Sequence, residues 1–331
     1  MAHRVETRDV HGRQVCTLLD EVSKAQASVI PALGFNLFDL QLPWKGALVA
    51  LIAVDPKFLE TGEKPSHGGT PVLFPYPNRV RGGRFEFGGK TYNLPINNGP
   101  NAIHGFAIEA PFDVLEHKAN KTSAHITARY QISKNSPDHL KDWPADAILE
   151  MTYKLTGPRL SLDVTVRNPT DRPLPFGFGI HPYFRLPWAA ATDPAETLVV
   201  FPAAKYWPLV DNLPTGEVLP VDARMDFRKG QPLAGLKLDD VLTDLPKDNR
   251  VCRLIDKAAG GEFRLSVDRG YRELVVFTPP WDPRSIAVEP YTQTTDAINL
   301  QAEGKDAGLR VLGHDESASF SMSMELGPAS R

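Results

Sequence analysis

Apolar and polar residues alternate along much of the chain with the period of two that is typical of half-buried β-strands. In "RLSLDVTVRNPTD" (159–171) four apolar residues share one face: Leu160, Leu162, Val164 and Val166. The segments "SAHITARYQIS" (123–133) and "AILEMTYKLTG" (147–157) precede it with the same alternation, and turn residues separate the three runs. This pattern predicts consecutive antiparallel strands.

Other segments extend the strand pattern. The short apolar run "GALVALIAVD" (46–55) predicts a buried strand, and "GRFEFGGKTYNL" (83–94) predicts a β-hairpin whose two central glycines supply positive φ angles. The segments "FRLSVDRGYRELVVFTPP" (263–280) and "ASFSMSMEL" (318–326) repeat the alternation near the C-terminus. Strands are therefore expected along the whole chain.

Helical patterns are scarce. Only "DHLKDW" (138–143) and "PLAGLKLDDVLTDL" (232–245) are expected to carry a turn or two of helix, and no repeat, low-complexity tract or linker divides the chain. We therefore expect an all-β fold: one domain over 1–331, built as a large antiparallel β-sandwich with few short helices. Function is expected on a concave sheet face or in its bordering loops.

Composition narrows the functional classes. The 30 prolines and 25 glycines among 331 residues favour many short elements. A net charge of -3 gives no electrostatic signature of a nucleic-acid or membrane partner. Cys16 and Cys252 lack the spacing of a disulfide framework or a zinc site. The charged start and the lack of any run near the roughly 18 apolar residues of a membrane span predict a cytoplasmic protein.

Two of the histidines have unusual surroundings. His104, in "NNGPNAIHGF", is followed by a glycine that lets another group approach the backbone closely. His181, in "LPFGFGIHPYFRLP", lies among aromatic residues directly before a proline. An imidazole in such a pocket can be tuned to donate a proton near neutral pH. The alternative for each is a core histidine satisfied by one hydrogen bond.

Glu289 is the carboxylate candidate. In "RSIAVEPYTQTTDAINL" it follows an apolar run and precedes a proline, which predicts a position near the end of a buried strand. Burial of a glutamate is costly unless the group is paired or used, and it raises the pKa of the carboxyl. The alternative is a salt bridge at the end of the strand.

Further polar anchors are expected from two segments. Arg79, in "PNRVRGG", offers a guanidinium suited to hydroxyls or carboxylates, whereas Arg81 and Arg84 are expected on solvated faces of the hairpin. Asp239 or Asp240, in "LKLDDVLTDL", is a second hydrogen-bonding candidate, with a helix N-cap as the alternative. Neither metal-ligand spacing nor a GxSxG nucleophile motif accompanies these residues.

Three segments, in this order, resemble the aldose 1-epimerase (galactose mutarotase) family, including its hexose-6-phosphate 1-epimerase relatives. The first, "NRVRGGRFEFGGKTYNLPINNGPNAIHGF", is similar to the family's "NRI..G.F...G..Y.L..NNG.N.LHGG", with Phe106 where a second glycine is common. The others are "GIHPYFRL" and "VEPYTQTTDAIN", which resemble "NHPYFNL" and "ETQ..PDA.N". The resemblance implies a galactose-mutarotase-type β-sandwich with the sugar on an open concave face.

The resemblance also implies residue roles. His181, entering as imidazolium, would be the general acid and Glu289 the general base, facing one another across the width of a pyranose. Asp239 is chosen as a sugar ligand because a large apolar residue, Leu242, follows it three positions on, although Asp240 stays open. The remaining implied site residues are His104 at the sugar ring and Arg79 and Asn98 as substrate ligands.

The activity implied is interconversion of the α and β anomers of a monosaccharide, with no cofactor and no metal, in a monomer or homodimer. Three alternatives stay open. One is a non-catalytic carbohydrate-binding sandwich. Another is an epimerase of a hexose 6-phosphate, with Arg81, Arg84 or Arg185 near C6. The third is a carbohydrate lyase or hydrolase. A hydrolase would need two carboxylates that flank the scissile bond.

Overall fold

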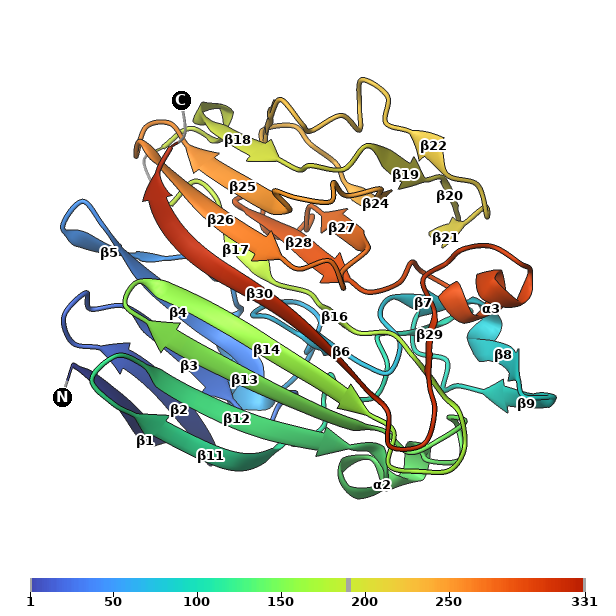
Figure 1. Ribbon diagram of the computed structural model, residues 1–331. Coiled ribbons are helices and arrows are strands. Elements are labelled where there is room, and N and C mark those ends of the chain that lie inside the picture. The colour runs from blue at the N-terminus through green and yellow to red at the C-terminus, as the bar shows by residue number, and fades with distance from the viewer. Residues whose placement is uncertain (1, 189–191, 330–331) are drawn as a thin grey trace.

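A nine-stranded sheet forms one layer of the protein (Figure 1), in a computed structural model that describes residues 2–188 and 192–329. Its strands, in spatial order, are β11 (Asp113–Ala119), β12 (Ala124–Gln131), β13 (Ile148–Thr156), β14 (Arg159–Arg167), β30 (Ser317–Pro328), β26 (Gly261–Val267), β25 (Val251–Asp256), β18 (Thr197–Val200) and β23 (Gln231–Pro232). Neighbouring strands are antiparallel throughout. The C-terminal strand β30 lies in the middle, between β14 and β26.

Two further sheets lie against the nine-stranded sheet. The eight-stranded sheet contains β22 (Leu219–Pro220), β19 (Lys205–Trp207), β24 (Asp239–Thr243), β27 (Glu273–Phe277), β28 (Ser285–Tyr291), β16 (Gly179–Ile180) and β6 (Val72–Leu73), with β17 (Tyr183–Arg185) also paired to β28. The five-stranded sheet contains β1 (His3–Val10), β2 (Arg13–Asp20), β3 (Gln26–Ile30), β4 (Asn36–Trp44) and β5 (Ala47–Ala50). A bridge between Ile52 and Phe184 joins these two sheets.

Short elements connect the sheets. Two-stranded ladders join β7 (Arg79–Val80) to β10 (Ala102–Ile103), β8 (Arg84–Phe87) to β9 (Lys90–Asn93), β15 (Leu174–Phe176) to β29 (Arg310–Leu312), and β20 (Leu209–Val210) to β21 (Leu213–Pro214). The helices are α1 (Pro56–Thr61), α2 (Ile132–Asn135) and α3 (Ala297–Ala302), with 3-10 turns at Arg81–Gly83, Pro137–His139 and Pro194–Glu196. The prediction of an all-β antiparallel sandwich with few short helices is confirmed.

The main core fills the space between the layers. Phe184 on β17 contacts Phe263 on β26, with ring centroids 4.7 Å apart, and Phe178 stacks on Phe320 of β30 at 6.3 Å. Aromatic pairs of this kind contribute beyond the area they bury. Because side chains alternate across a strand, the next residues along the eight-stranded sheet point away from this core.

That outward face of the eight-stranded sheet is also covered. Val241, Val275 and Tyr291 pack there in a second cluster, whereas Leu242, next to Val241, and Leu274, next to Val275, belong to the main core. Strands buried on both faces read as continuous apolar runs, which explains the unbroken burial of β28. Polar groups on this outward face are therefore placed in a mostly apolar setting.

Most sequence-predicted strands are confirmed, including the hairpin of β8 and β9 and the alternating strands β12, β13 and β14. The predicted buried strand at 46–55 is only partly right. Its strand, β5, ends at Ala50 and is largely exposed, because it lies at the edge of the five-stranded sheet. Burial begins afterwards, at Leu51 and Ile52.

The predicted helical turn within 232–245 is wrong: Pro232 ends β23, residues 233–236 form a single non-helical turn, and no helix lies in this segment. Residues Asp239–Thr243 form β24, which pairs with both β19 and β27. Val241 pairs with Val275 and Leu242 pairs with Leu274, so one pair of apolar side chains is buried on each face of the sheet. This tertiary pairing overrides the local helical pattern. The other predicted turn, 138–143, corresponds to the 3-10 turn Pro137–His139 and the bends after it.

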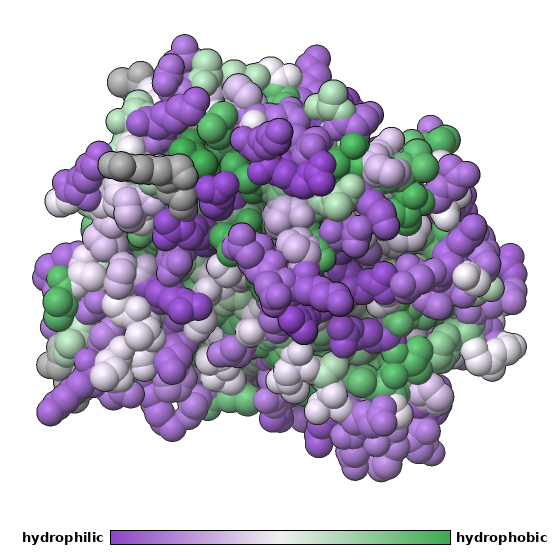
Figure 2. Space-filling model, turned by 45° about the horizontal axis from the view of Figure 1, so that its top comes forward, coloured by the Kyte–Doolittle hydropathy of each residue, from purple (hydrophilic) through white to green (hydrophobic). Residues whose placement is uncertain are grey.

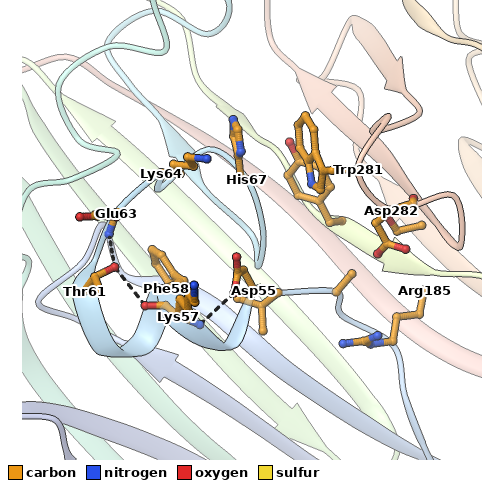
Figure 3. A pocket seen from close by; sticks show the side chains of 14 residues that line it. Asp55, Lys57, Phe58, Thr61, Glu63, Lys64, His67, Arg185, Trp281 and Asp282 are labelled. Carbon is orange, nitrogen blue, oxygen red and sulfur yellow. Dashed lines mark hydrogen bonds between the residues drawn. The ribbon is translucent and has the colours of Figure 1, made fainter.

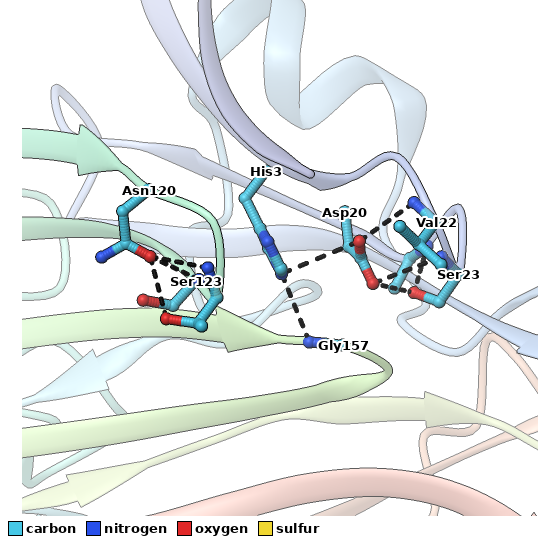
Figure 4. Close-up of polar contacts among 9 residues, drawn as sticks. His3, Asp20, Val22, Ser23, Asn120, Ser123 and Gly157 are labelled. Atoms are coloured by element: carbon cyan, nitrogen blue, oxygen red, sulfur yellow. Dashed lines mark hydrogen bonds and ion pairs between the residues drawn. The ribbon is translucent and has the colours of Figure 1, made fainter. Parts of the chain in front are cut away.

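The N-terminal strand is tied to the nine-stranded sheet by His3 (Figure 4). The backbone N–H of Gly157, in the turn between β13 and β14, lies 3.4 Å from His3 Nε2, and Asp20 Oδ1 lies 3.7 Å from the same nitrogen. Asp20 also accepts hydrogen bonds from the backbone of Val22 and the hydroxyl of Ser23. The five-stranded sheet is thus fastened at its outer strand as well as through its apolar face.

The molecular face drawn in Figure 2 is mainly hydrophilic, with small hydrophobic patches between polar side chains. In the part of the chain that the structure describes, no helix combines the length and the apolar character needed to cross a membrane. The expected single domain over 1–331 stays a prediction, and residues 1, 189–191 and 330–331 lie outside the described part.

Candidate active site

All six predicted site residues line one pocket. This site pocket, with a volume of about 380 Å³, lies between the outward face of the eight-stranded sheet and the segment 78–109. The six residues are Arg79, Asn98, His104, His181, Asp239 and Glu289. The resemblance thus named side chains from four separate parts of the sequence that the fold brings together.

Glu289 lies near the end of β28 and is 1% exposed. It pairs with Val275 of β27, so its side chain emerges on the outward face of the sheet. Burial raises the pKa of Glu289 well above the ordinary value, because the charged carboxylate loses its hydration. The direction predicted from the sequence is confirmed, and it makes this carboxyl a stronger base once ionised.

Tyr291 holds one oxygen of this carboxyl. Its hydroxyl donates a hydrogen bond to Glu289 Oε2, and its ring is fully buried. Residues two apart on a strand share a face, so the phenol and the carboxyl stand side by side. The hydrogen bond favours the ionised carboxylate and lowers the pKa of Glu289, in opposition to burial. The other oxygen, Oε1, is left toward His181.

His181 follows β16 and is held from both sides. Its backbone N–H donates to the carbonyl of Pro71 at 2.9 Å, and its ring stacks on Tyr183 with centroids 4.6 Å apart. The Nε2 atom of His181 lies 3.2 Å from Glu289 Oε1. Burial lowers the pKa of His181 to about 3. The structure thus brings the two predicted acid–base residues into direct contact.

The His181–Glu289 pair holds one proton in either of two arrangements. These are a neutral imidazole with a carboxylic acid, or an imidazolium with a carboxylate, and the pair is neutral overall in both. Burial alone favours the first arrangement, whereas we expected His181 to enter as imidazolium. Hydrogen bonds from sugar hydroxyls to the carboxylate would favour the second. An imidazole and a carboxyl in such contact can act as acid and base in one step.

Backbone pairing brings Arg79 and His104 together. Arg79 on β7 is opposite Ile103 on β10, and the N–H of His104 donates to the carbonyl of Asn78 at 3.1 Å. The guanidinium of Arg79 donates through Nε to Asn98 Oδ1 at 2.9 Å. The interpretation of the first motif is confirmed in this respect, since its two ends meet at one edge of the pocket.

His104 faces His181, with ring centroids 5.6 Å apart. Its backbone has φ 71°, a left-handed value that costs energy for any residue with a side chain. Burial, followed by the charges of His181 and Arg79, lowers the pKa of His104 well below the ordinary value, so its imidazole is neutral. Within the described residues its Nδ1 has no hydrogen-bond partner.

Gly105 fixes the position of His104, and the substitution Gly105→Ala is expected to destabilise the protein. Gly105 has φ +74°, and an added Cβ would lie 2.2 Å from the carbonyl oxygen of Phe74, which accepts hydrogen bonds from Phe106 and Ala107. Backbone strain alone costs about 1–3 kcal/mol. Gly99→Ala is the matched control, since Gly99 has φ +58° with no neighbour within 4 Å of the added Cβ. Urea unfolding should show a clearly larger loss for Gly105→Ala, and equal losses would contradict a steric role.

Asp239, rather than Asp240, faces the site pocket. Asp239 begins β24 and lies opposite Phe277, another pocket residue. Asp240 points elsewhere and forms a bidentate pair with Arg224, with N–O distances of 3.1 and 2.9 Å. Of the two aspartates left open by the sequence, Asp239 is the one that lines the site pocket, and its role as a ligand stays a prediction. The helix N-cap alternative does not apply because the segment is a strand.

Other pocket residues were missed by sequence reasoning. They are Pro65, Ser66, His67, Asn78, Asn97, Ile103, Ile108, Glu109, Tyr183, Val275, Phe277 and Trp281, with Tyr291 behind Glu289. Tyr291 had a sequence signal, because it lies two residues after Glu289 on a predicted strand. Trp281 and His67 had none, since both lie in loops whose approach to the pocket depends on the whole fold.

All three arginines considered for a phosphate have partners within the protein, and Arg185 donates through Nε to the carbonyl of Ile52 at 3.0 Å. Arg81 contacts Asp296 at 3.2 Å, and exposed Arg84 lies 3.8 Å from Glu86, whereas Arg185 lines a neighbouring cavity (Figure 3). For residues 2–188 and 192–329, no three His, Cys, Asp or Glu side chains are grouped so that they could hold a metal ion.

Comparisons with known proteins agree with what the geometry of the site indicates. A sequence model described as aldose 1-epimerase matches residues 29–325. Galactose mutarotase of Mus musculus is 33% identical over 197 residues, covering 56% of this chain and 55% of the mouse protein. Maltose epimerase of Levilactobacillus brevis is 26% identical over 247 residues, covering 68% of this chain and 67% of that protein. The matches span about half the length of the mammalian relatives.

A solved structure gives the same fold. A galactose mutarotase-like protein from Clostridium acetobutylicum is similar with a TM-score of 0.89, covering 98% of this chain and 99% of that chain. The sequence identity of the two is 22%, so the likeness concerns the fold alone.

Proposed function

The chain belongs to the aldose 1-epimerase family, and from that premise we propose that it interconverts the α and β anomers of an aldose by acid–base opening and closure of the hemiacetal ring. The observation that carries the proposal is the 3.2 Å contact between His181 Nε2 and Glu289 Oε1 inside a pocket that also contains Arg79 and Asp239. Pure binding needs no buried imidazole–carboxyl pair.

In the proposed reaction, Glu289 accepts the proton of the C1 hydroxyl while His181 donates a proton to the ring oxygen. The bond between C1 and the ring oxygen breaks, and C1 becomes an aldehyde carbon. Rotation about the C1–C2 bond exposes the other face of the carbonyl, and closure there runs both proton transfers in reverse. General acid and general base catalysis contribute about 10²- to 10⁴-fold each. Atoms and charge balance without a further reactant.

The contact geometry suits this chemistry better than the spacing that we expected from the sequence. We expected the acid and base to face one another across a pyranose, yet the two groups touch. The two oxygens that exchange protons are bonded to the same carbon, C1, so adjacent donor and acceptor atoms can reach both. Arg79 and Asp239 would hold the hydroxyls on the rest of the ring, and His104 would face the ring beside His181.

Catalysis can be tested by polarimetry of freshly dissolved α-glucose and α-galactose, with NMR anomeric exchange for pentoses and hexose 6-phosphates. The protein should accelerate mutarotation of at least one free aldose well above the buffer rate. Saturable sugar binding without acceleration would favour the non-catalytic alternative. A cytoplasmic location and a monomeric or homodimeric state stay predictions.

Tyr291→Phe is expected to shift the pH dependence rather than abolish activity. The phenol stabilises ionised Glu289, so its removal raises the pKa of that carboxyl. The base is active when deprotonated, and the acidic limb of kcat/KM should therefore move to higher pH. A pH–rate profile from pH 4 to 9 measures this, and an unchanged acidic limb would argue that Tyr291 has only a packing role. Tyr271→Phe, another fully buried tyrosine, is the control.

A further inference from the structure

Tyr183 lies against the proposed general acid. Its ring stacks on the imidazole of His181, with centroids 4.6 Å apart and planes 15° from parallel. The phenol oxygen of Tyr183 lies 3.4 Å from His181 Nε2, the same atom that lies 3.2 Å from Glu289 Oε1. Both rings are buried. Tyr183 therefore covers a face of the imidazole and places its oxygen beside the nitrogen that faces the proposed base.

The single hydrogen of this phenol is directed to another partner. The hydroxyl of Tyr183 donates to the backbone carbonyl of Ser66 at 2.6 Å, so that hydrogen is not available to His181. Burial, followed by the charges of Glu289 and Asp239, raises the pKa of Tyr183, so the phenol stays protonated at neutral pH. The oxygen thus presents lone pairs to His181. It can stabilise a protonated Nε2, but it has no hydrogen to offer to an unprotonated one.

The ring and the oxygen of Tyr183 both favour a charged His181. The face of an aromatic ring attracts a cation that lies within about 6 Å of its centroid, and the stacked imidazole is inside that range. The phenol oxygen adds partial negative charge close to Nε2. A neutral imidazole gains much less from either contact. Tyr183 therefore opposes the effect of burial, which lowers the pKa of His181 to about 3.

Other groups around His181 act on its charge in both directions. The titratable side chains that share the site pocket with it are Glu289 on β28, Asp239 on β24, Arg79 on β7, His104 after β10, and His67 and Glu109 in loops. Ionised carboxylates favour the imidazolium, and the guanidinium opposes it. The two other imidazoles would oppose it only if charged, and burial lowers the pKa of both. Among the described residues, Tyr183 is the one ring that stacks nearly parallel on His181.

We propose that Tyr183 is a positioning residue for the reaction, which holds the ring of His181 in place and stabilises its imidazolium form beside ionised Glu289. This inference rests on the proposed function, because ring opening requires a proton donor at His181. It also explains how a deeply buried histidine can enter the reaction charged. In the reaction itself His181 gives its proton to the ring oxygen, and Tyr183 neither gains nor loses one.

Tyr183→Phe tests the role of the phenol oxygen, since phenylalanine keeps the stacked ring. The pH at which His181 is half-protonated can be measured by 15N NMR of the sugar-free protein, with His181→Asn to assign the signal. We expect this midpoint to fall by about one pH unit, because the protonated form loses a stabilising contact. With an aldose, kcat should fall about three- to tenfold, while KM stays within about twofold. An equal midpoint, or an unchanged kcat, would overturn the inference.

Two controls separate this role from packing. Ser66→Gly loosens the loop that Tyr183 holds but leaves the phenol, so the midpoint of His181 should stay in place. Tyr153→Phe removes a buried hydroxyl that lies outside the site pocket and has no hydrogen-bond partner among the described residues, and it should also leave the midpoint unchanged. A shift in Ser66→Gly as large as that in Tyr183→Phe would overturn the inference. If the parent protein accelerates no aldose, the proposed function fails, whereas the NMR midpoints still decide whether Tyr183 stabilises the imidazolium.

Discussion

Glu289→Gln is expected to reduce kcat/KM for anomer interconversion by about 10²- to 10⁴-fold, the usual contribution of a positioned general base. The amide keeps the shape of the side chain and can still accept the hydrogen bond of Tyr291, but it cannot take a proton from the C1 hydroxyl. Stability should not fall at neutral pH. A carboxyl whose folded-state pKa is raised costs stability once the pH exceeds its unfolded value, and the neutral amide avoids that cost. Polarimetry together with thermal unfolding separates the two effects.

Glu273→Gln is the matched control for this experiment. Glu273 is also fully buried, lies opposite Tyr291 on the neighbouring strand, and has a pKa raised by burial to about 7. It accepts a hydrogen bond from Trp207 at 3.2 Å and does not line the site pocket. Its variant should keep activity within about threefold of the parent. Near-full activity of Glu289→Gln would remove Glu289 from the role of base.

His181→Asn is expected to have the second large effect, again about 10²- to 10⁴-fold in kcat/KM. Asparagine can hydrogen-bond to the ring oxygen but cannot deliver a proton as the bond to C1 breaks. His139→Asn serves as the control, because His139 stacks on Phe106 at 4.5 Å and lies outside the site pocket. Retention of near-full activity by His181→Asn would end its assignment as the acid.

The double variant Glu289→Gln, His181→Asn should be scarcely slower than either single variant. The two groups lie in direct contact and act in the same ring-opening step, so losing either one blocks that step. Catalytic groups that act as a unit show strongly non-additive losses. Losses that simply multiply would indicate two independent catalytic contributions.

Local patterns and family motifs together predicted much of this protein. The alternation in 159–171 specifies β14 because one face is buried and the other is not. The Gly88–Gly89 hairpin follows from backbone angles that few other residues adopt. Five site residues were named because three motifs keep characteristic residue types at fixed spacing, and Asp239 was chosen because Leu242 follows it three positions on. All six side chains line one pocket.

Properties that depend on strand pairing were not predictable. Residues 232–245 carry apolar positions compatible with a helix, and only pairing with β19 and β27 selects the strand at Asp239–Thr243. The direct His181–Glu289 contact depends on how β16 and β28 are placed next to each other. The cavity between α1 and the loop around Trp281 forms from segments far apart in the chain, so no single stretch of sequence encodes it.

The central position of β30 has a consequence for synthesis on the ribosome. Strands β11 to β14 and strands β25 and β26 form two halves of a sheet that share no ladder with each other, and residues 317–328 join them. Translation proceeds at roughly 5–20 residues per second. The edges of β14 and β26 that pair with β30 therefore stay unpaired until residues 317–328 leave the ribosomal exit tunnel. During that interval β14 and β26 are open to pairing with other nascent chains, and holding chaperones have their clearest opportunity to bind.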